Sequence, residues 1–302
     1  MLYLILSVLV SASLIFIFKL FQKYNVHTFQ AIVINYVVCV LVGLLFPGGT
    51  EVLQSEIFTR TWAYYAMALG TIFMVTFYLM ALTTHKVGVT ATSVAAKISL
   101  VIPVLFSLLV LQTSLKEYTI INYIGMAAAL VAIVMTSIRP RRDGELKTSR
   151  TVALLLPLII FLNSGVADSL INYTNQYHLQ PHEAGQFTML TFGTSAAAGG
   201  IVLLYQLVIL KSSFSRRSIL AGIVLGVPNY FSIFFLILAL SAFGNDGAFL
   251  YPVNNIGIIL IGALGAVIFF HEKLSKLNLT GIGVAILALI LISYQEIIAY
   301  LN

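Results

Sequence analysis

The chain has 302 residues, of which 60% are hydrophobic and only 9% charged, and its formal net charge at pH 7 is +6. Soluble domains carry about 25% charged residues, so a soluble fold of this composition could not cover its surface with polar groups. Most of the chain must therefore face lipid. The excess positive charge lies in connecting segments, where it orients helices, and it is not a sign of nucleic-acid binding.

Ten apolar segments can each supply the roughly 20 residues that a helix needs to cross about 30 Å of hydrocarbon. They cover residues 2–21, 28–47, 62–82, 88–111, 119–138, 152–174, 184–209, 218–241, 248–270 and 277–299. Transmembrane strands need only about 10 residues and alternate in polarity, which these segments do not. We therefore predict an all-α integral membrane protein with ten transmembrane helices.

Two weak internal similarities suggest that the chain is a repeat. Residues 115–131 resemble 272–287 with an offset of about 156, and residues 24–31 resemble 177–184 with an offset of 153. The hydrophilic stretch 139–151 then separates a first five-helix repeat, 1–138, from a second, 152–302. Because five is an odd number, the second copy must enter the membrane from the opposite side, which predicts inverted repeats.

The loop charges indicate an orientation. Loops that follow odd-numbered segments carry thirteen Lys and Arg residues, whereas loops that follow even-numbered segments carry only Arg60 and Lys116. By the positive-inside rule the odd loops are cytoplasmic. Both termini of this multi-pass cell (inner) membrane protein are then expected to be extracytoplasmic.

Glu272 precedes Gly281 by nine residues, a small-residue helix follows, and the fourth segment contains Pro103. In these features the chain resembles the drug/metabolite transporter superfamily, in its ten-helix EamA-like branch. The first copy departs from the pattern, because Glu117 lies only eight residues before Gly125. Members of this family are commonly drawn with both termini in the cytoplasm, which the loop charges of this chain contradict.

The resemblance implies a secondary active transporter, an exporter, that moves small organic metabolites such as amino acids or drugs by alternating access. It implies coupling to protons or to a counter-substrate, with no cofactor and no enzymatic reaction. We expect the small-residue runs to pack a monomer, with a dimer as the alternative. The His residues show no metal-ligand spacing, so no metal is expected.

Two charges lie in the middle of predicted spans. Lys97 follows Thr90 and Ser93 at helical spacing, and Asp168 is followed one turn later by Asn172. Charges in a bilayer are costly and usually face a cavity or a partner. Both are candidates for substrate binding, together or singly, and Asp168 is also a candidate proton carrier. The alternatives are a structural ion pair, or a Lys97 side chain that extends to the membrane surface.

Further candidates lie beside prolines in the second half. Tyr251, Asn254 and Asn255 surround Pro252, and Asn229 and Tyr230 follow Pro228. Proline removes a helical hydrogen bond, and interrupted helices near the midplane are where transporters build binding sites. The repeat alignment places Asn254 and Asn255 within one or two positions of Lys97. These side chains are predicted to bind substrate, and contact between helices is the alternative.

Two residues near these candidates receive a structural interpretation. Asn35 is expected to hold neighbouring helices together. Glu272 is expected to be a solvated surface group, and ion binding is the alternative.

The rival function is a membrane-embedded enzyme or a flippase acting on a lipid-linked substrate. Clustered carboxylates, His or Cys would favour it, and the ten acidic residues are scattered while Cys39 is the only cysteine. A non-transporting sensor is the third reading, although the chain has no long polar stretch to serve as a soluble domain.

Overall fold

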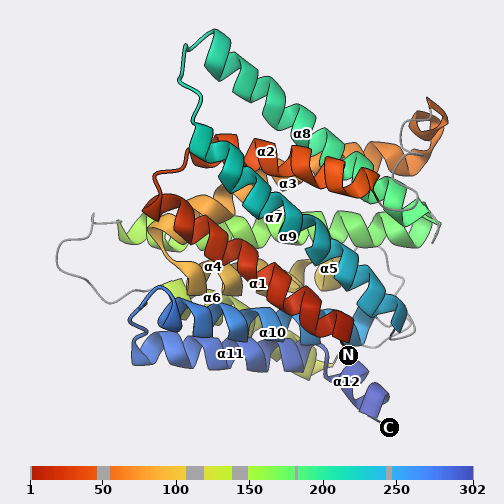
Figure 1. Cartoon of the computed structure of the whole chain (residues 1–302). Coiled ribbons are helices and arrows are strands. Elements are labelled where there is room, and N and C mark those ends of the chain that lie inside the picture. The colour runs from red at the N-terminus through yellow and green to blue at the C-terminus, as the bar shows by residue number, and fades with distance from the viewer. Residues whose placement is uncertain are drawn as a thin grey trace. The chain divides into compact units, whose positions relative to one another are not determined.

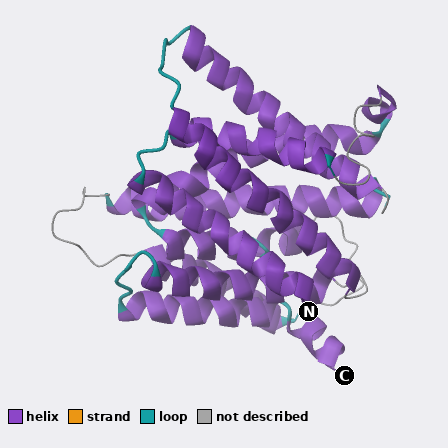
Figure 2. Ribbon diagram, in the orientation of Figure 1, coloured by secondary structure: helices purple, strands orange, loops and turns teal. Residues whose placement is uncertain are grey.

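The computed structural model describes residues 2–45, 55–106, 119–137, 149–180, 183–242 and 247–301. These residues form helices and loops without a strand, which confirms the all-α class (Figures 1 and 2). A short 3-10 helix, Ser55–Thr59, precedes α3. The α-helices are α1 (Leu2–Lys23), α2 (Thr28–Leu44), α3 (Thr61–Lys86), α4 (Val89–Ile98), α5 (Val101–Phe106), α6 (Ile120–Ser137), α7 (Arg150–Tyr177), α8 (Ala184–Val208), α9 (Arg216–Ala242), α10 (Gly247–Ile268), α11 (Lys276–Ile292) and α12 (Tyr294–Leu301).

Six of the described helices are long and apolar enough to cross a membrane, namely those within α1, α3, α7, α8, α9 and α10. Four shorter apolar helices, in α2, α4, α6 and α11, overlap the remaining predicted spans. The chain is thus a helical protein with several potential membrane-spanning segments. The full number of ten spans stays a prediction.

The predicted span 88–111 is interrupted. Helix α4 ends at Ile98, and α5 begins at Val101, so the break lies just after Lys97. In a continuous helix the carbonyl of Ser99 would accept from the N–H of residue 103, but Pro103 has none. The Ser99 carbonyl accepts instead from the N–H of Ile102 at 2.9 Å, in a tighter turn. Residues 107–111 of this span lie outside the described ranges.

The chain forms two compact units, and each takes segments from both predicted halves. The first unit comprises Met1–Lys19, Leu79–Gly165 and Ser232–Asn302, and the second comprises Leu20–Tyr78 and Val166–Phe231. Residues 139–148 of the predicted linker lie outside the described ranges. The division into halves at 139–151 therefore stays a prediction about repetition in the sequence.

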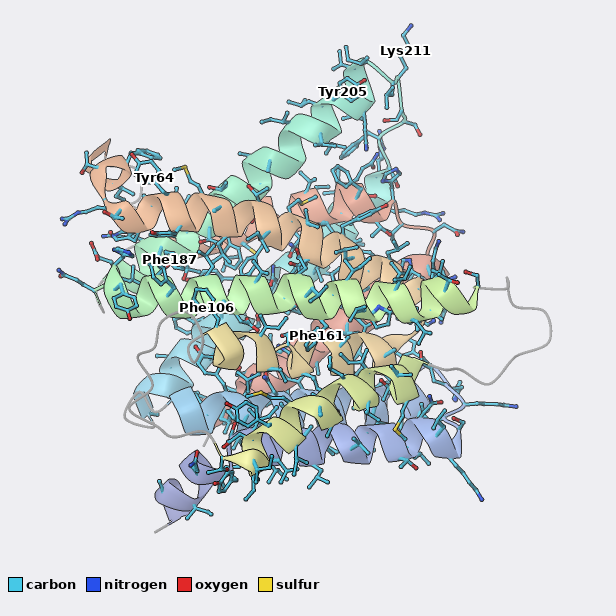
Figure 3. All side chains as sticks on the ribbon, turned by 180° about the vertical axis from the view of Figure 1, so that it is seen from behind. Tyr64, Phe106, Phe161, Phe187, Tyr205 and Lys211 are labelled. Atoms are coloured by element: carbon cyan, nitrogen blue, oxygen red, sulfur yellow. The ribbon has the colours of Figure 1, made fainter. Side chains whose placement is uncertain are left out.

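Each unit has its own apolar core. In the first unit, α4, α6, α10 and α11 surround a cluster that includes Val94, Ala129, Phe161, Ile259 and Ala285. In the second unit, α3, α7 and α8 enclose a cluster around Trp62. The centroid of its ring lies 6.3 Å from that of Phe187, which is labelled in Figure 3.

Helices α6 and α11 lie side by side in the first unit and are antiparallel, because the start of each contacts the end of the other (Figure 1). At the start of α6, the Nδ2 group of Asn122 donates to the carbonyls of Ile292 at 2.8 Å and Leu291 at 3.4 Å. At the start of α11, the Nδ2 group of Asn278 donates to the carbonyls of Met135 at 3.0 Å and Thr136 at 3.4 Å.

The other atom of each amide caps its own helix. The Oδ1 of Asn122 accepts from the N–H of Thr119 at 2.9 Å and from its hydroxyl at 3.1 Å. The Oδ1 of Asn278 accepts from the N–H of Ser275 at 3.0 Å and from its hydroxyl at 2.9 Å. Every atom in one set corresponds to an atom in the other after a shift of 156 residues.

Glycines let these two helices approach closely. A Cβ on Gly125 would lie 2.9 Å from both the backbone nitrogen of Ile292 and the Cβ of Leu291. One on Gly281 would lie 2.8 Å from the Cβ of Met135. Both distances are shorter than Cβ contacts in proteins, so only glycine fits without a shift of the helices. The two glycines are again 156 residues apart.

In the second unit, α2 and α8 pack in the same reciprocal way. A side chain on Gly43, late in α2, would meet Met189 early in α8, and one on Gly199, late in α8, would meet Val33 early in α2. Between these contacts the rings of Tyr36 and Phe192 pack at 6.0 Å between centroids. The two members of each related pair, 43 and 199, 33 and 189, and 36 and 192, also differ by 156.

Candidate functional site

The first unit brings part of the predicted site together at the break between α4 and α5. The Nδ2 group of Asn255, on α10, donates to the backbone carbonyl of Lys97 at 3.1 Å. This carbonyl belongs to the last turn of α4, where carbonyls lack a partner within their own helix. Asn255 thus caps the interrupted helix, while the side chain of Lys97 is half-buried.

Asn254 is also buried, with 3% of its surface exposed. Its Oδ1 accepts from the hydroxyl of Ser7 on α1 at 3.2 Å, and Ser7 also lies 3.5 Å from the carbonyl of Ser232. The half-buried Tyr251 lies one turn earlier on α10. In the first unit, Asn255 therefore contacts the helix break at Lys97, and the neighbouring Asn254 contacts Ser7 on α1.

The second unit holds the other predicted residues. Asp168 is half-buried on α7, and Asn172 lies four residues later on the same helix. On α9, the Nδ2 group of Asn229 lies 3.2 Å from the Oδ1 of Asn35 and 3.4 Å from the Sγ of Cys39. Tyr230, the next residue, is 9% exposed.

Sequence reasoning did not identify two of these partner residues and gave a third a purely structural role. Ser7 and Cys39 were not predicted as site residues, because single Ser and Cys residues are common in apolar helices and give no signal of their own. Asn35 was read as a contact between helices. It does contact α9, and its spacing of four residues from Cys39 could have shown that both face the same neighbour.

The expectation that Glu272 is a solvated surface group was wrong. This side chain is half-buried, and its carboxylate accepts from the N–H of Val89 at 3.1 Å and from the hydroxyl of Thr90 at 3.4 Å. Both donors belong to the first turn of α4, whose N-cap residue, Gly88, has no side chain to serve them. A carboxylate at this position satisfies free N–H groups and complements the helix dipole.

Comparisons with known proteins give a relative and a fold. No family model matches the chain. An uncharacterized protein of Haemophilus influenzae is 26% identical over 304 residues, which cover 97% of this chain and 98% of that one. A protein crystal structure has a TM-score of 0.55 to this chain and 13% sequence identity, and the match covers 96% of both chains. This likeness supports the fold over nearly the whole chain and carries no information on activity.

Proposed function

We propose that the chain is a secondary active transporter that carries small organic solutes, such as amino acids or drugs, across the cell membrane by alternating access. Inverted repeats build many folds of this functional class, with the binding site where the two copies meet. The proposal assigns the ten apolar segments to ten spans in two copies of five.

The observation that carries the proposal is the set of paired contacts that recur after 156 residues. They occur between α6 and α11 in the first unit and between α2 and α8 in the second. Each pair is antiparallel, as expected when one copy is turned over relative to the other. Reciprocal contacts of this kind are hard to explain unless the two halves of the chain share one architecture, and they support inversion of one copy.

The break after Lys97 is a second support. Transporters commonly bind substrates and ions where helices are interrupted, because freed carbonyls and N–H groups supply polar contacts inside the membrane. Here the break lies beside a Lys and is capped by Asn255. A cation in this position suits a carboxylate or another anionic group of a solute.

The test is thermal unfolding of the detergent-purified protein with a panel of amino acids, sugars, nucleotides and cationic drugs. A solute that binds the folded state raises the melting temperature by an amount equivalent to about 2.7 kcal/mol at 100 times its dissociation constant. Lys97→Ala and Asp168→Asn are expected to abolish that shift, whereas Lys273→Ala, which removes an exposed loop charge, is expected to keep it.

Flux measurements complete the test. Protein in liposomes should exchange labelled solute for unlabelled solute across the bilayer. If a solute binds but neither variant changes its affinity or its exchange, the assignment of a substrate-binding role to Lys97 and to Asp168 is wrong. If no solute of any class binds or exchanges, the transporter proposal itself fails and a lipid-linked substrate becomes the better hypothesis.

A further inference from the structure

A buried polar cluster joins α2 to α9 in the second unit. Asn35 and Cys39 have no exposed surface, and Asn229 has 3%. The thiol of Cys39 donates to the carbonyl of Gly226 at 3.4 Å and lies 3.9 Å from the Oδ1 of Asn35, which also accepts from Asn229 at 3.2 Å. Three polar side chains thus meet between two apolar helices.

One polar atom of this cluster is unsatisfied. The Nδ2 group of Asn35 is buried and has no hydrogen-bond partner among the described residues. Turning both amides by 180° would preserve the bond between them and leave the oxygen of Asn35 without a partner instead. One polar atom of Asn35 therefore lacks a hydrogen-bond partner whichever way the two amides are oriented. Buried amides without partners are costly in a protein and costlier in hydrocarbon.

The equivalent interface elsewhere in the same unit shows that packing does not require these groups. The shift of 156 relates Cys39 to Ser195, and Gly226 to Gly70. The hydroxyl of Ser195 donates to the carbonyl of Gly70 at 2.8 Å, as the thiol of Cys39 does to Gly226. The two interfaces therefore share their geometry.

The two interfaces differ in the polarity of their side chains. Asn35 corresponds to Thr191, whose hydroxyl bonds the carbonyl of Phe187 within its own helix at 2.8 Å, and Asn229 corresponds to the apolar Phe73. At the compared positions the closed interface, between α3 and α8, has both of its hydroxyl groups hydrogen-bonded, whereas the interface between α2 and α9 holds two amides with a spare hydrogen-bonding group. A purely structural contact between helices would be expected to look alike in both places.

We propose that Asn35, Cys39 and Asn229 form a subsite that binds an uncharged, hydrogen-bonding group of the transported solute, such as a carbonyl or hydroxyl. The group takes the free position on Asn35 when the α2–α9 interface opens during the transport cycle. The groups bonded to Asn35 and Cys39 are uncharged, which disfavours an ionised ligand group at this point. The inference rests on the proposed transport function.

The single thiol of the chain provides the test. The wild-type protein in native membranes is treated with N-ethylmaleimide, and modification of Cys39 is followed by mass spectrometry. The matched control is the double variant Cys39→Ser/Ser195→Cys, which moves the thiol to the equivalent position of the closed interface. Ser213→Cys in the Cys39→Ser background supplies an exposed reference thiol, since residue 213 lies in an exposed loop.

A state populated at about 0.1–10% would make Cys39 react roughly 10 to 1000 times more slowly than the reference thiol. The thiol at position 195 is expected to remain unmodified over the same period. Neutral methyl methanethiosulfonate should also modify Cys39, whereas its anionic sulfonatoethyl counterpart should modify only the reference. Equal reactivity of the thiols at 39 and 195, or an unreactive Cys39 in protein whose denatured form reacts fully, would overturn the proposal.

These outcomes are separate from those that test transport itself. The labelling rates need no identified solute, so a failed subsite is seen even in a protein that exchanges solute. Cys39→Ser is expected to fold, because serine already makes the same contact at position 195. Once a solute is known, Asn35→Ala should weaken its binding about 10-fold or more, the loss expected for an unmade hydrogen bond, while Thr191→Ala should not.

Discussion

The paired asparagines of α6 and α11 allow a quantitative test of the relation between the two halves. Asn122→Ala and Asn278→Ala each remove one helix cap and two hydrogen bonds to carbonyls of the partner helix. The loss of a cap costs about 1 kcal/mol, and each bond contributes about 0.5–1.5 kcal/mol. Either change should therefore destabilise the protein by about 2–4 kcal/mol.

The two effects should be similar and should add. Met135, the partner of Asn278, lies 13 residues along α6 from Asn122, which is about 20 Å at 1.5 Å per residue. Sites this far apart that share no partner usually combine to within about 0.5 kcal/mol. The double variant should then lose about 4–8 kcal/mol.

Thermal unfolding of the purified protein checks this, because about 2–4 °C is lost per kcal/mol in chains of a few hundred residues. Each single variant should melt about 5–15 °C lower. Thr280→Ala, which removes an exposed hydroxyl bond within α11, is the control and should change the melting temperature little. If one asparagine proves dispensable while the other is essential, the equivalence of the two helix starts is refuted.

Three further outcomes follow from single contacts. Gly125→Ala and Gly281→Ala should each destabilise by about 1–3 kcal/mol in the same assay, because the new methyl group has no space, whereas Gly283→Ala meets nothing within 4 Å and should be neutral or stabilising. Equal effects at all three positions would contradict this. Glu272→Ala should cost about 0.5–2 kcal/mol through loss of the α4 cap; an unchanged melting temperature would show that the carboxylate contributes nothing. If the loop charges set the orientation, the C-terminus is extracytoplasmic and alkaline phosphatase fused after Asn302 should be active. An inactive phosphatase fusion together with an active cytoplasmic reporter at the same position would show the opposite orientation.

The positions of the helices could be predicted because charge is excluded from lipid. Every predicted span overlaps a described helix. The interruptions could not be placed in the same way. Within the last predicted span, 277–299, helix α11 ends at Ile292 and a second helix, α12, begins at Tyr294. The carbonyl of Ile292 is taken by Asn122, 170 residues away, so the end of α11 depends on a contact that local sequence does not reveal.

The contacts of the predicted site residues were less accessible to sequence reasoning. The alignment of the two halves places Asn255 within two positions of the residue equivalent to Lys97, and the contact between its side chain and the Lys97 carbonyl is seen only in the structure. No pattern in the sequence marks Ser7, and its hydrogen bond to Asn254 is known only because the structure places α1 beside this residue. Single polar residues in apolar helices become interpretable when the facing helix is known.

The two offsets found in the sequence have one physical explanation. At the α1–α2 junction the N–H of Val26 donates to the carbonyl of Phe21, and at the α7–α8 junction the N–H of Leu179 donates to that of Thr174, in both cases at 2.9 Å and with an offset of 153. From Val33 in α2 and Met189 in α8 onward, the related contacts differ by 156. Three additional residues around the second junction account for the change.

A short insertion in a loop leaves helix packing intact, because loops tolerate changes of length and packed helices do not. The repetition should thus survive where backbones touch, at Gly125 and Gly281 or at Gly70 and Gly226, even though most side chains differ. Side chains that break the repetition at such contacts are then informative, since the shared packing does not call for them. Asn35 and Asn229 are of this kind, because they differ from the equivalent residues Thr191 and Phe73. A ligand should therefore be sought at these two asparagines before it is sought at the polar groups that are the same in both halves.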